Sequence, residues 1–135
     1  MDHHIKILVV DDNEDSRELV AKVLKQYGYQ IILAVDGEDA LVKVLSEKPD
    51  LILMDRSLPK MNGLEVARRL KSEEATRKIP IVALTAHAMR GDREKALAAG
   101  CEGYIPKPIN VRTLADQVRS YLEGQGGSLA SGEKE

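Results

Sequence analysis

Three aspartates directly follow short apolar runs, where a chain could assemble a site for a cation. Asp11 and Asp12 follow the run "KILVV", and Asp55 follows "LILM". Neighbouring carboxylates repel one another and are costly to remove from water, so three in one place need a positive partner to stay ionised. Mg²⁺ suits such a set because it takes oxygen ligands and is often held by one or two carboxylates. The sequence therefore predicts a magnesium site built on these three acids.

Helix capping is the simpler explanation for part of this pattern. Asp11 and Asp12 could cap the following helix and complement its dipole, and Asp55 could open a turn. This explanation does not account for an acid at the end of a second strand. We expect capping to explain part of the role of one residue and cation binding to explain the set. Zinc is disfavoured, because no His or Cys stands at a strand end near the acids.

Two further polar residues follow later apolar runs. Thr85 ends the strand in "ALTAH", and Lys107 follows the strand in "YIPKP". A hydroxyl and an ammonium beside a metal-bound carboxylate can each take one oxygen of a phosphoryl group. A carboxylate can itself accept that group by in-line attack, which gives an aspartyl phosphate. Asp55 is the predicted nucleophile because it stands alone, which leaves Asp11 and Asp12 to hold the metal.

Five short apolar runs alternate with stretches of helical periodicity. Runs that are apolar at every position indicate strands buried on both faces of a parallel sheet. The runs are "KILVV", "IILAV", "LILM", "IVAL" and a weaker "GYI". Helices are expected after Asp12 or Asn13, after "DG" at 36–37, around 64–70, over 86–99, and from the cap Asn110 with the stripe Val111, Leu114, Val118 and Leu122. The fourth helix has mostly small apolar residues, so we expect it to be thinly anchored.

This alternation predicts one α/β domain with a doubly wound five-stranded parallel sheet and helices on both faces. The expected strand order is 2-1-3-4-5, whose topological switch point lies at the carboxyl ends of the first and third strands. All three acids fall there. We expect the domain to span residues 1–123 and residues 124–135, which are rich in Gly and Ser, to form a flexible tail or truncated linker.

Composition narrows the possible functions. The 135 residues include 20 basic and 22 acidic side chains and only 3% aromatic residues, which argues against direct nucleic-acid binding. No apolar segment approaches the length of a membrane span, and the N-terminus lacks the pattern of a secretion signal. The single cysteine, Cys101, cannot form an internal disulfide. These features predict a cytoplasmic protein that does not enter membranes.

The motifs together resemble a known family. "LVVDD", "LILMD" followed by "LPKMNG", "ALTA" and "YIPKP", in this order and at these separations, are similar to the receiver domain of bacterial two-component response regulators, as in single-domain chemotaxis regulators. The likeness covers about residues 5–122. It implies a flavodoxin-like fold and a phosphorelay switch rather than an enzyme. Such a switch would assist its own phosphorylation and slow dephosphorylation. The phosphoryl donor would be a sensor histidine kinase or a phosphotransfer protein.

The resemblance also implies a metal site, position by position. Asp55 matches the phosphoacceptor, and Asp12, with Asp11 acting partly through water, matches the Mg²⁺ ligands. Asp55 would itself contact the metal, and Ser57 would contribute its backbone carbonyl.

The resemblance further implies a conformational switch. Thr85 matches the switch hydroxyl, Lys107 the phosphate-pairing amine, and Tyr104 the aromatic residue that turns inward when Thr85 moves. Lys107-Pro108 matches a peptide that is usually cis in the family. The face of the fourth helix, fifth strand and fifth helix would bind a downstream effector, and phosphorylation could drive dimerisation there.

Two other functions remain open at this point. A haloacid-dehalogenase-like phosphatase also forms an aspartyl phosphate with Mg²⁺, but its nucleophile strand normally carries a second acid where this chain has Ser57. A phosphorylation-independent binding module would keep the fold without the switch, and the complete acidic set argues against it.

Overall fold

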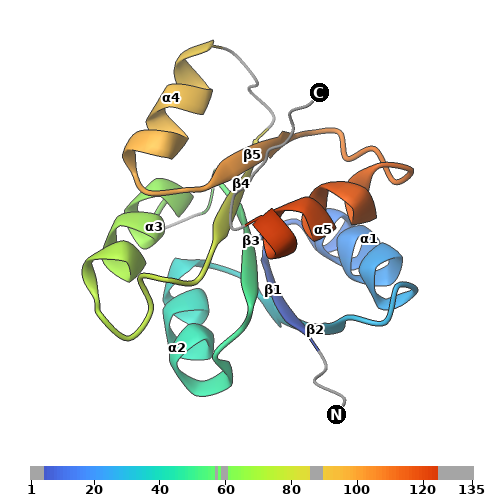
Figure 1. Cartoon of the computed structure of the whole chain (residues 1–135), viewed down its shortest axis with the longest axis horizontal. Coiled ribbons are helices and arrows are strands. Elements are labelled where there is room, and N and C mark those ends of the chain that lie inside the picture. Colours follow the sequence, from blue (N-terminus) through green and yellow to red (C-terminus); the bar gives the residue numbers. More distant parts are fainter. Residues whose placement is uncertain (1–4, 57, 59–60, 86–89, 125–135) are drawn as a thin grey trace.

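A five-stranded parallel sheet lies between two layers of helices in the computed structural model, which describes residues 5–56, 58, 61–85 and 90–124 (Figure 1). The strand order is β2-β1-β3-β4-β5, which confirms the predicted order. The elements are β1 (Lys6–Val10), α1 (Glu14–Lys25), β2 (Gln30–Ala34), α2 (Gly37–Glu47), β3 (Leu51–Asp55), α3 (Gly63–Ser72), β4 (Ile81–Thr85), α4 (Arg90–Ala98), β5 (Gly103–Pro106) and α5 (Leu114–Gly124).

Each face of the sheet has its own hydrophobic core. Alternate residues of β1 divide between them: Ile7 and Val9 face one core, and Leu8 and Val10 face the other. Helices α1 and α5 cover the first face, and α2, α3 and α4 cover the second (Figure 1). The central strands are fully buried on both sides, which explains why their sequences are apolar at every position.

Three helices begin at side-chain caps. The side chains of Asn13, Asp36 and Asn62 accept hydrogen bonds from backbone amides three residues later and start α1, α2 and α3. Of the two candidates for the first cap, Asn13 is therefore the one used. Asp12 is free of the capping role that a purely local explanation would give it.

The last helix begins later than the sequence predicted. The side chain of Asn110 accepts a hydrogen bond from the amide of Arg112 at 3.0 Å, and its carbonyl accepts from Leu114. These two bonds are those of a helix cap, and a turn over residues 111–113 stands between the cap and α5. Asn110 thus makes the bonds of a helix cap, as predicted, but α5 itself begins only at Leu114, and Val111, 44% exposed, lies in the turn before α5 rather than in its stripe.

The predicted fourth helix lies partly beyond the described residues. Its described part is α4 (Arg90–Ala98), while residues 86–89 are not described. Ala96 and Ala99 are its buried contributions to the core, so the expectation of a thinly anchored helix agrees with the packing. Residues 125–135 are also outside the described residues, and the expected tail stays a prediction. No described helix has both the length and the apolar character needed to cross a membrane.

Lys71 connects the ends of several elements near the amino ends of the strands, at the opposite end of the sheet from the acids. Its ammonium donates to the carbonyls of Arg77 at 3.0 Å and Ile79 at 2.8 Å, and lies 3.0 Å from a carboxylate oxygen of Glu102. The other oxygen of Glu102 accepts from the amide of Ile81 at 2.7 Å. One side chain thus joins α3, the start of β4 and the turn between α4 and β5.

Gly100 allows this arrangement. Its φ of +102° is one that L side chains rarely adopt, and a Cβ there would lie 2.6 Å from Cγ of Lys71. The stem of Lys71 therefore runs directly over the end of α4 and holds that end in place.

We predict that Lys71→Met lowers the free energy of unfolding by about 1–3 kcal/mol, because three acceptors lose their donor while the stem is kept. Urea unfolding measures the change. Lys78→Met is the control, since Lys78 is exposed, and should change stability by less than about 0.5 kcal/mol. Equal losses in the two variants would contradict the role of Lys71.

We also predict an unreactive thiol at Cys101. Burial, with the charge of Glu102, raises the pKa of Cys101 from 9.0 to about 11. Iodoacetamide should therefore label the folded protein at pH 8 far more slowly than the urea-unfolded protein. Because the unfolded thiol ionises first, stability should fall as pH rises from about 9 to 11, and Cys101→Ala should remove that part of the fall. Fast labelling of the folded protein would contradict this prediction.

Candidate functional site

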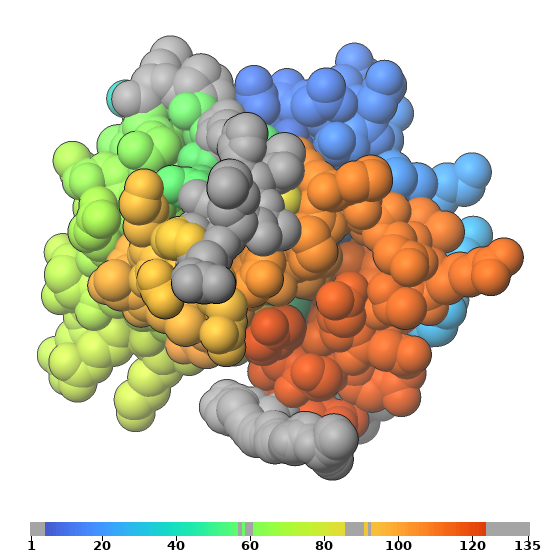
Figure 2. All heavy atoms as spheres, turned by 90° about the horizontal axis from the view of Figure 1, so that it is seen from above, coloured from blue at the N-terminus to red at the C-terminus, as the bar shows by residue number. Residues whose placement is uncertain are grey.

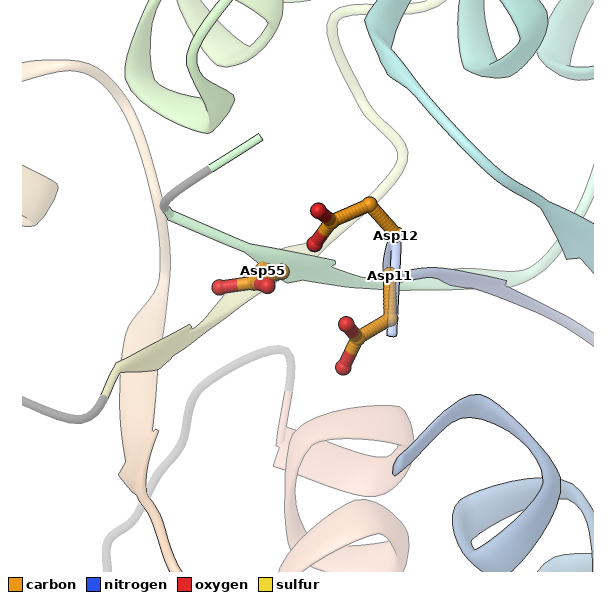
Figure 3. Close-up of side chains that lie close together, drawn as sticks. All are labelled: Asp11, Asp12 and Asp55. Atoms are coloured by element: carbon orange, nitrogen blue, oxygen red, sulfur yellow. The ribbon is translucent and has the colours of Figure 1, made fainter. Parts of the chain in front are cut away.

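Three carboxylates converge at the carboxyl ends of β1 and β3. Asp11 and Asp12 follow β1 directly, and Asp55 is the last residue of the neighbouring strand β3. One carboxylate oxygen from each lies within 4.8 Å of the others, and the three side chains project into the same space (Figure 3). Asp11 and Asp55 are buried, whereas Asp12 is exposed. The structure thus brings together the acids that the sequence placed at separate strand ends.

Lys107 reaches into this acidic cluster from the end of β5. Its ammonium lies 3.1 Å from Asp11 and 3.4 Å from Asp55. Burial lowers the pKa of Lys107, but its hydrogen bonds with Asp11 and Asp55 and their charges outweigh burial and raise the pKa above its ordinary value. Lys107 is therefore a cation at neutral pH, and the three carboxylates and Lys107 together carry surplus negative charge.

A backbone hydrogen bond holds Lys107 in position. The amide of Lys107 donates to the carbonyl of Thr85 at 2.7 Å, so the end of β5 is fixed to the end of β4. The peptide between Lys107 and Pro108 is cis, as the resemblance implied. The side chain is only 18% exposed, so its charge is directed at the acids and not at bulk water.

Asp11 already has a partner for each carboxylate oxygen. One oxygen accepts from the amide of Asn13 at 3.0 Å, and the other accepts from Lys107. The backbone carbonyl of Asp11 also accepts from Arg17 at 2.8 Å. Asp11 is therefore a fixed support at the base of the site, and exposed Asp12 is better placed for direct contact with an ion.

Gly63 sets the position of Asp55, and sequence reasoning recognised it only as part of a helix start. A Cβ at Gly63 would collide with the carbonyl oxygen of Asp55 and lie 3.0 Å from Cα of Arg56. The amide of Gly63 donates to the carbonyl of Arg56 at 3.0 Å. The first turn of α3 can therefore press against the backbone of the acid. The only sequence signal for this contact was a glycine at the beginning of a helix.

Thr85 and Tyr104 lie on one face of the sheet, beside the acidic cluster. Thr85 is the last residue of β4 and is 4% exposed. Tyr104 pairs in register with Ala83, two residues before Thr85, so the three side chains share a face. Tyr104 is half-buried against the core beneath α3 and α4. Ser57 lies outside the described residues, and its predicted role stays a prediction.

The donor set fits a hard divalent cation. Among the described residues the cluster holds carboxylate oxygens and no His or Cys, which is the chemistry that Mg²⁺ prefers and zinc does not. Surplus negative charge in a partly buried place supplies the attraction. The exposed position of Asp12 leaves a route from solvent for an ion that keeps several of its waters.

Comparisons with known proteins identify the family. A model of the response regulator receiver domain matches residues 7–119. The chain belongs to this family. This receiver domain is 42% identical over 116 residues to the polar-differentiation response regulator DivK of Brucella anthropi, a match that covers 86% of the chain and 94% of the relative. Receiver domains act in phosphorelay signalling, where they interact with histidine kinases and effectors.

Solved structures agree with this assignment. The chemotaxis response regulator CheY4 of Vibrio cholerae has a TM-score of 0.82 and 30% identity, over 87% of this chain and 98% of the other. The receiver domain of sensor histidine kinase PA1611 from Pseudomonas aeruginosa has a TM-score of 0.83 and 34% identity, over 90% of this chain and 100% of the other. That structure contains a magnesium ion coordinated in the active site cleft.

We predict that Asp12→Asn stabilises this receiver domain in EDTA, because one of three mutually repelling charges is removed. The expected gain in the free energy of unfolding is about 1 kcal/mol. Urea unfolding with and without Mg²⁺ measures it. In saturating Mg²⁺ the unchanged protein should instead have the higher free energy of unfolding, since an ion that binds only the folded state stabilises the protein with the better site more.

Asp116→Asn is the matched control, because Asp116 is exposed in the first turn of α5 and pairs with Arg119 rather than with the cluster. It should not stabilise the protein in EDTA. A loss of stability in Asp12→Asn without metal would show that repulsion does not govern the site.

Proposed function

We propose that this receiver domain is a Mg²⁺-dependent phosphoacceptor switch in which Asp55 accepts a phosphoryl group from a phosphohistidine. One observation carries the proposal: three carboxylates lie within 4.8 Å of one another while Lys107 contacts two of them. Such a cluster can take both a divalent cation and a dianionic group. A site that served stability alone would balance its charges.

The transfer step follows from the position of Asp55. A carboxylate oxygen of Asp55 attacks the phosphorus atom, a P–O bond forms, and the P–N bond to the imidazole breaks, with its electron pair staying on nitrogen. The donor is a sensor histidine kinase or a phosphotransfer protein. In-line geometry is favoured because Gly63 and the end of β3 hold the backbone of Asp55 still.

Each remaining residue has one role in this proposal. Asp12 and Asp55, with the backbone carbonyl of Ser57, would hold Mg²⁺, and Asp11 would contribute partly through water because both its oxygens already have partners. Bound Mg²⁺ supplies charge neutralisation for the incoming phosphoryl oxygens. Lys107 leaves Asp11 and pairs with one of those oxygens.

The switch follows from the new charge. Phosphorylation adds roughly −1.5 to −2 charges at Asp55, and the hydroxyl of Thr85 moves to donate a hydrogen bond to it. The space that Thr85 leaves admits the ring of Tyr104, which lies on the same face of the sheet. The face made by α4, β5 and α5 thereby changes between two states, which an effector protein reads and which also allows a phosphorylation-dependent dimer. We place this activity in the cytoplasm.

The test is phosphorylation of purified protein by acetyl phosphate or by a phosphorylated kinase, followed by intact mass. Asp55→Asn should abolish the Mg²⁺-dependent mass increase, whereas Asp116→Asn should behave like the unchanged protein. EDTA should have the same effect as Asp55→Asn. Undiminished labelling of Asp55→Asn would contradict the proposal, and rapid multiple turnover of p-nitrophenyl phosphate would point instead to a phosphatase.

A further inference from the structure

Tyr121 of α5 occupies a notch that Gly103 leaves in β5. A Cβ at Gly103 would collide with the phenol oxygen of Tyr121 and lie 2.5 Å from Cζ and 2.7 Å from Cε1. Any other side chain at this position would therefore expel the ring. A glycine inside a strand weakens it, so such a position calls for a reason of this kind. At Gly103 the reason is that the phenol of Tyr121 needs the space that a side chain would fill.

The phenol lies at the open edge of the sheet. Among the strands that the structure describes, β5 pairs only with β4, so every second residue of β5 turns its amide away from the sheet. The amide of Lys107 donates to the carbonyl of Thr85 in β4. The carbonyl of Leu84, the preceding residue of β4, points to the other side and accepts from the amide of Arg56 after β3. By this alternation, odd-numbered residues of β5 face β4, and the amide of Tyr104 faces the open edge. The notch at Gly103 places the oxygen of Tyr121 beside it.

The acid–base behaviour of Tyr121 agrees with this geometry. Burial raises the pKa of Tyr121, while a backbone hydrogen bond with Tyr104 and the charge of Arg93 act to lower it. A hydrogen bond that lowers the pKa of a phenol is one in which the phenol oxygen accepts. The amide of Tyr104 is therefore the donor.

The residues that act on the phenol of Tyr121 come from different elements. Tyr121 belongs to α5, Tyr104 to β5 and Arg93 to α4. These elements lie next to one another on one face of the molecule (gold to red in Figure 2). The side chain of Tyr104 lies in the core beneath α3 and α4, whereas Tyr121 packs in the core beneath α1 and α5. Tyr121 thus connects the two helical layers around the edge of the sheet.

We propose that Tyr121 is a positioning residue of the switch, which holds the backbone of Tyr104 through the Gly103 notch and carries the rotation of Tyr104 to α5. This inference rests on the proposed switch, since it names the path by which that switch reaches a second helix. Because the amide of Tyr104 is held in place, the switch rotates the side chain of Tyr104 while the strand stays fixed. The strain of that rotation then acts on α5 and not on an edge strand free to slide.

The first test needs no phosphorylation. In Tyr121→Phe the ring still fills the notch but the amide of Tyr104 loses its acceptor, so its hydrogen exchange should accelerate by roughly tenfold or more. Exchange at Ile105, whose amide faces β4, should not change. Tyr27→Phe is the control, because Tyr27 is exposed at the end of α1. Unchanged exchange at Tyr104 would overturn the inference.

The second test measures the coupling by amide NMR with Mg²⁺ and beryllofluoride, a phosphoryl mimic. In the unchanged protein and in Tyr27→Phe, signals of Thr85, Tyr104 and Ser120 in α5 should shift. In Tyr121→Phe, Thr85 and Tyr104 should still shift, while the shift at Ser120 should fall to less than about half. Gly103→Ala should give the same loss while keeping the hydroxyl.

The outcomes separate the two proposals. If Thr85 and Tyr104 of the unchanged protein do not respond, the proposed function fails. If they respond and Ser120 of Tyr121→Phe shifts fully, Tyr121 only covers the strand edge and the inference fails. A structural role alone would not lower the shift at Ser120 while leaving that at Thr85 intact.

Discussion

Repulsion among three carboxylates is the constraint on which the functional end of this receiver domain depends. Strands β1 and β3 are adjacent and buried apart from Lys6, so the backbones of Asp11, Asp12 and Asp55 cannot move apart without breaking the centre of the sheet. Lys107 offsets part of the charge and is itself held by burial and by the carbonyl of Thr85. The remaining negative charge stays in a rigid place, which gives the site an attraction for cations.

Local structure around the acids keeps them available for this role. Asn13 caps α1, so Asp12 does not have to, and the amide of Asn13 fixes one oxygen of Asp11. On the other strand, Gly63 lets α3 approach the backbone of Asp55. Asn13 and Gly63 thus stabilise the local structure, and the side chains of Asp12 and Asp55 are not needed for that purpose. The division explains why a site with unbalanced charge can exist within a stable fold.

The sequence predicted the sheet and the convergence of the acids, because both depend on strong regular signals. Apolar runs at every position indicate buried parallel strands, and strand order then determines which strand ends meet. The cap at Asn110 was predicted, but α5 begins later than the stripe from Val111 indicated, because a turn follows the cap and apolar spacing does not distinguish that turn from a helix. The contacts of Lys71 with Glu102 and of Tyr121 with Gly103 span residues far apart in sequence and have no periodic signal.

The distribution of packing explains where such a domain can change shape. β1 and β3 each pair with strands on both sides, whereas β5 pairs only with β4. α4 contributes only small side chains to the core among its described residues, and Lys71 holds its C-terminal end. Movement is therefore least costly at the edge formed by β5 and α4, next to the rigid acids rather than among them. In the proposed switch, a charge added at Asp55 would act on this edge through Thr85 and Tyr104, and Tyr121 would keep the edge strand from absorbing the change by sliding.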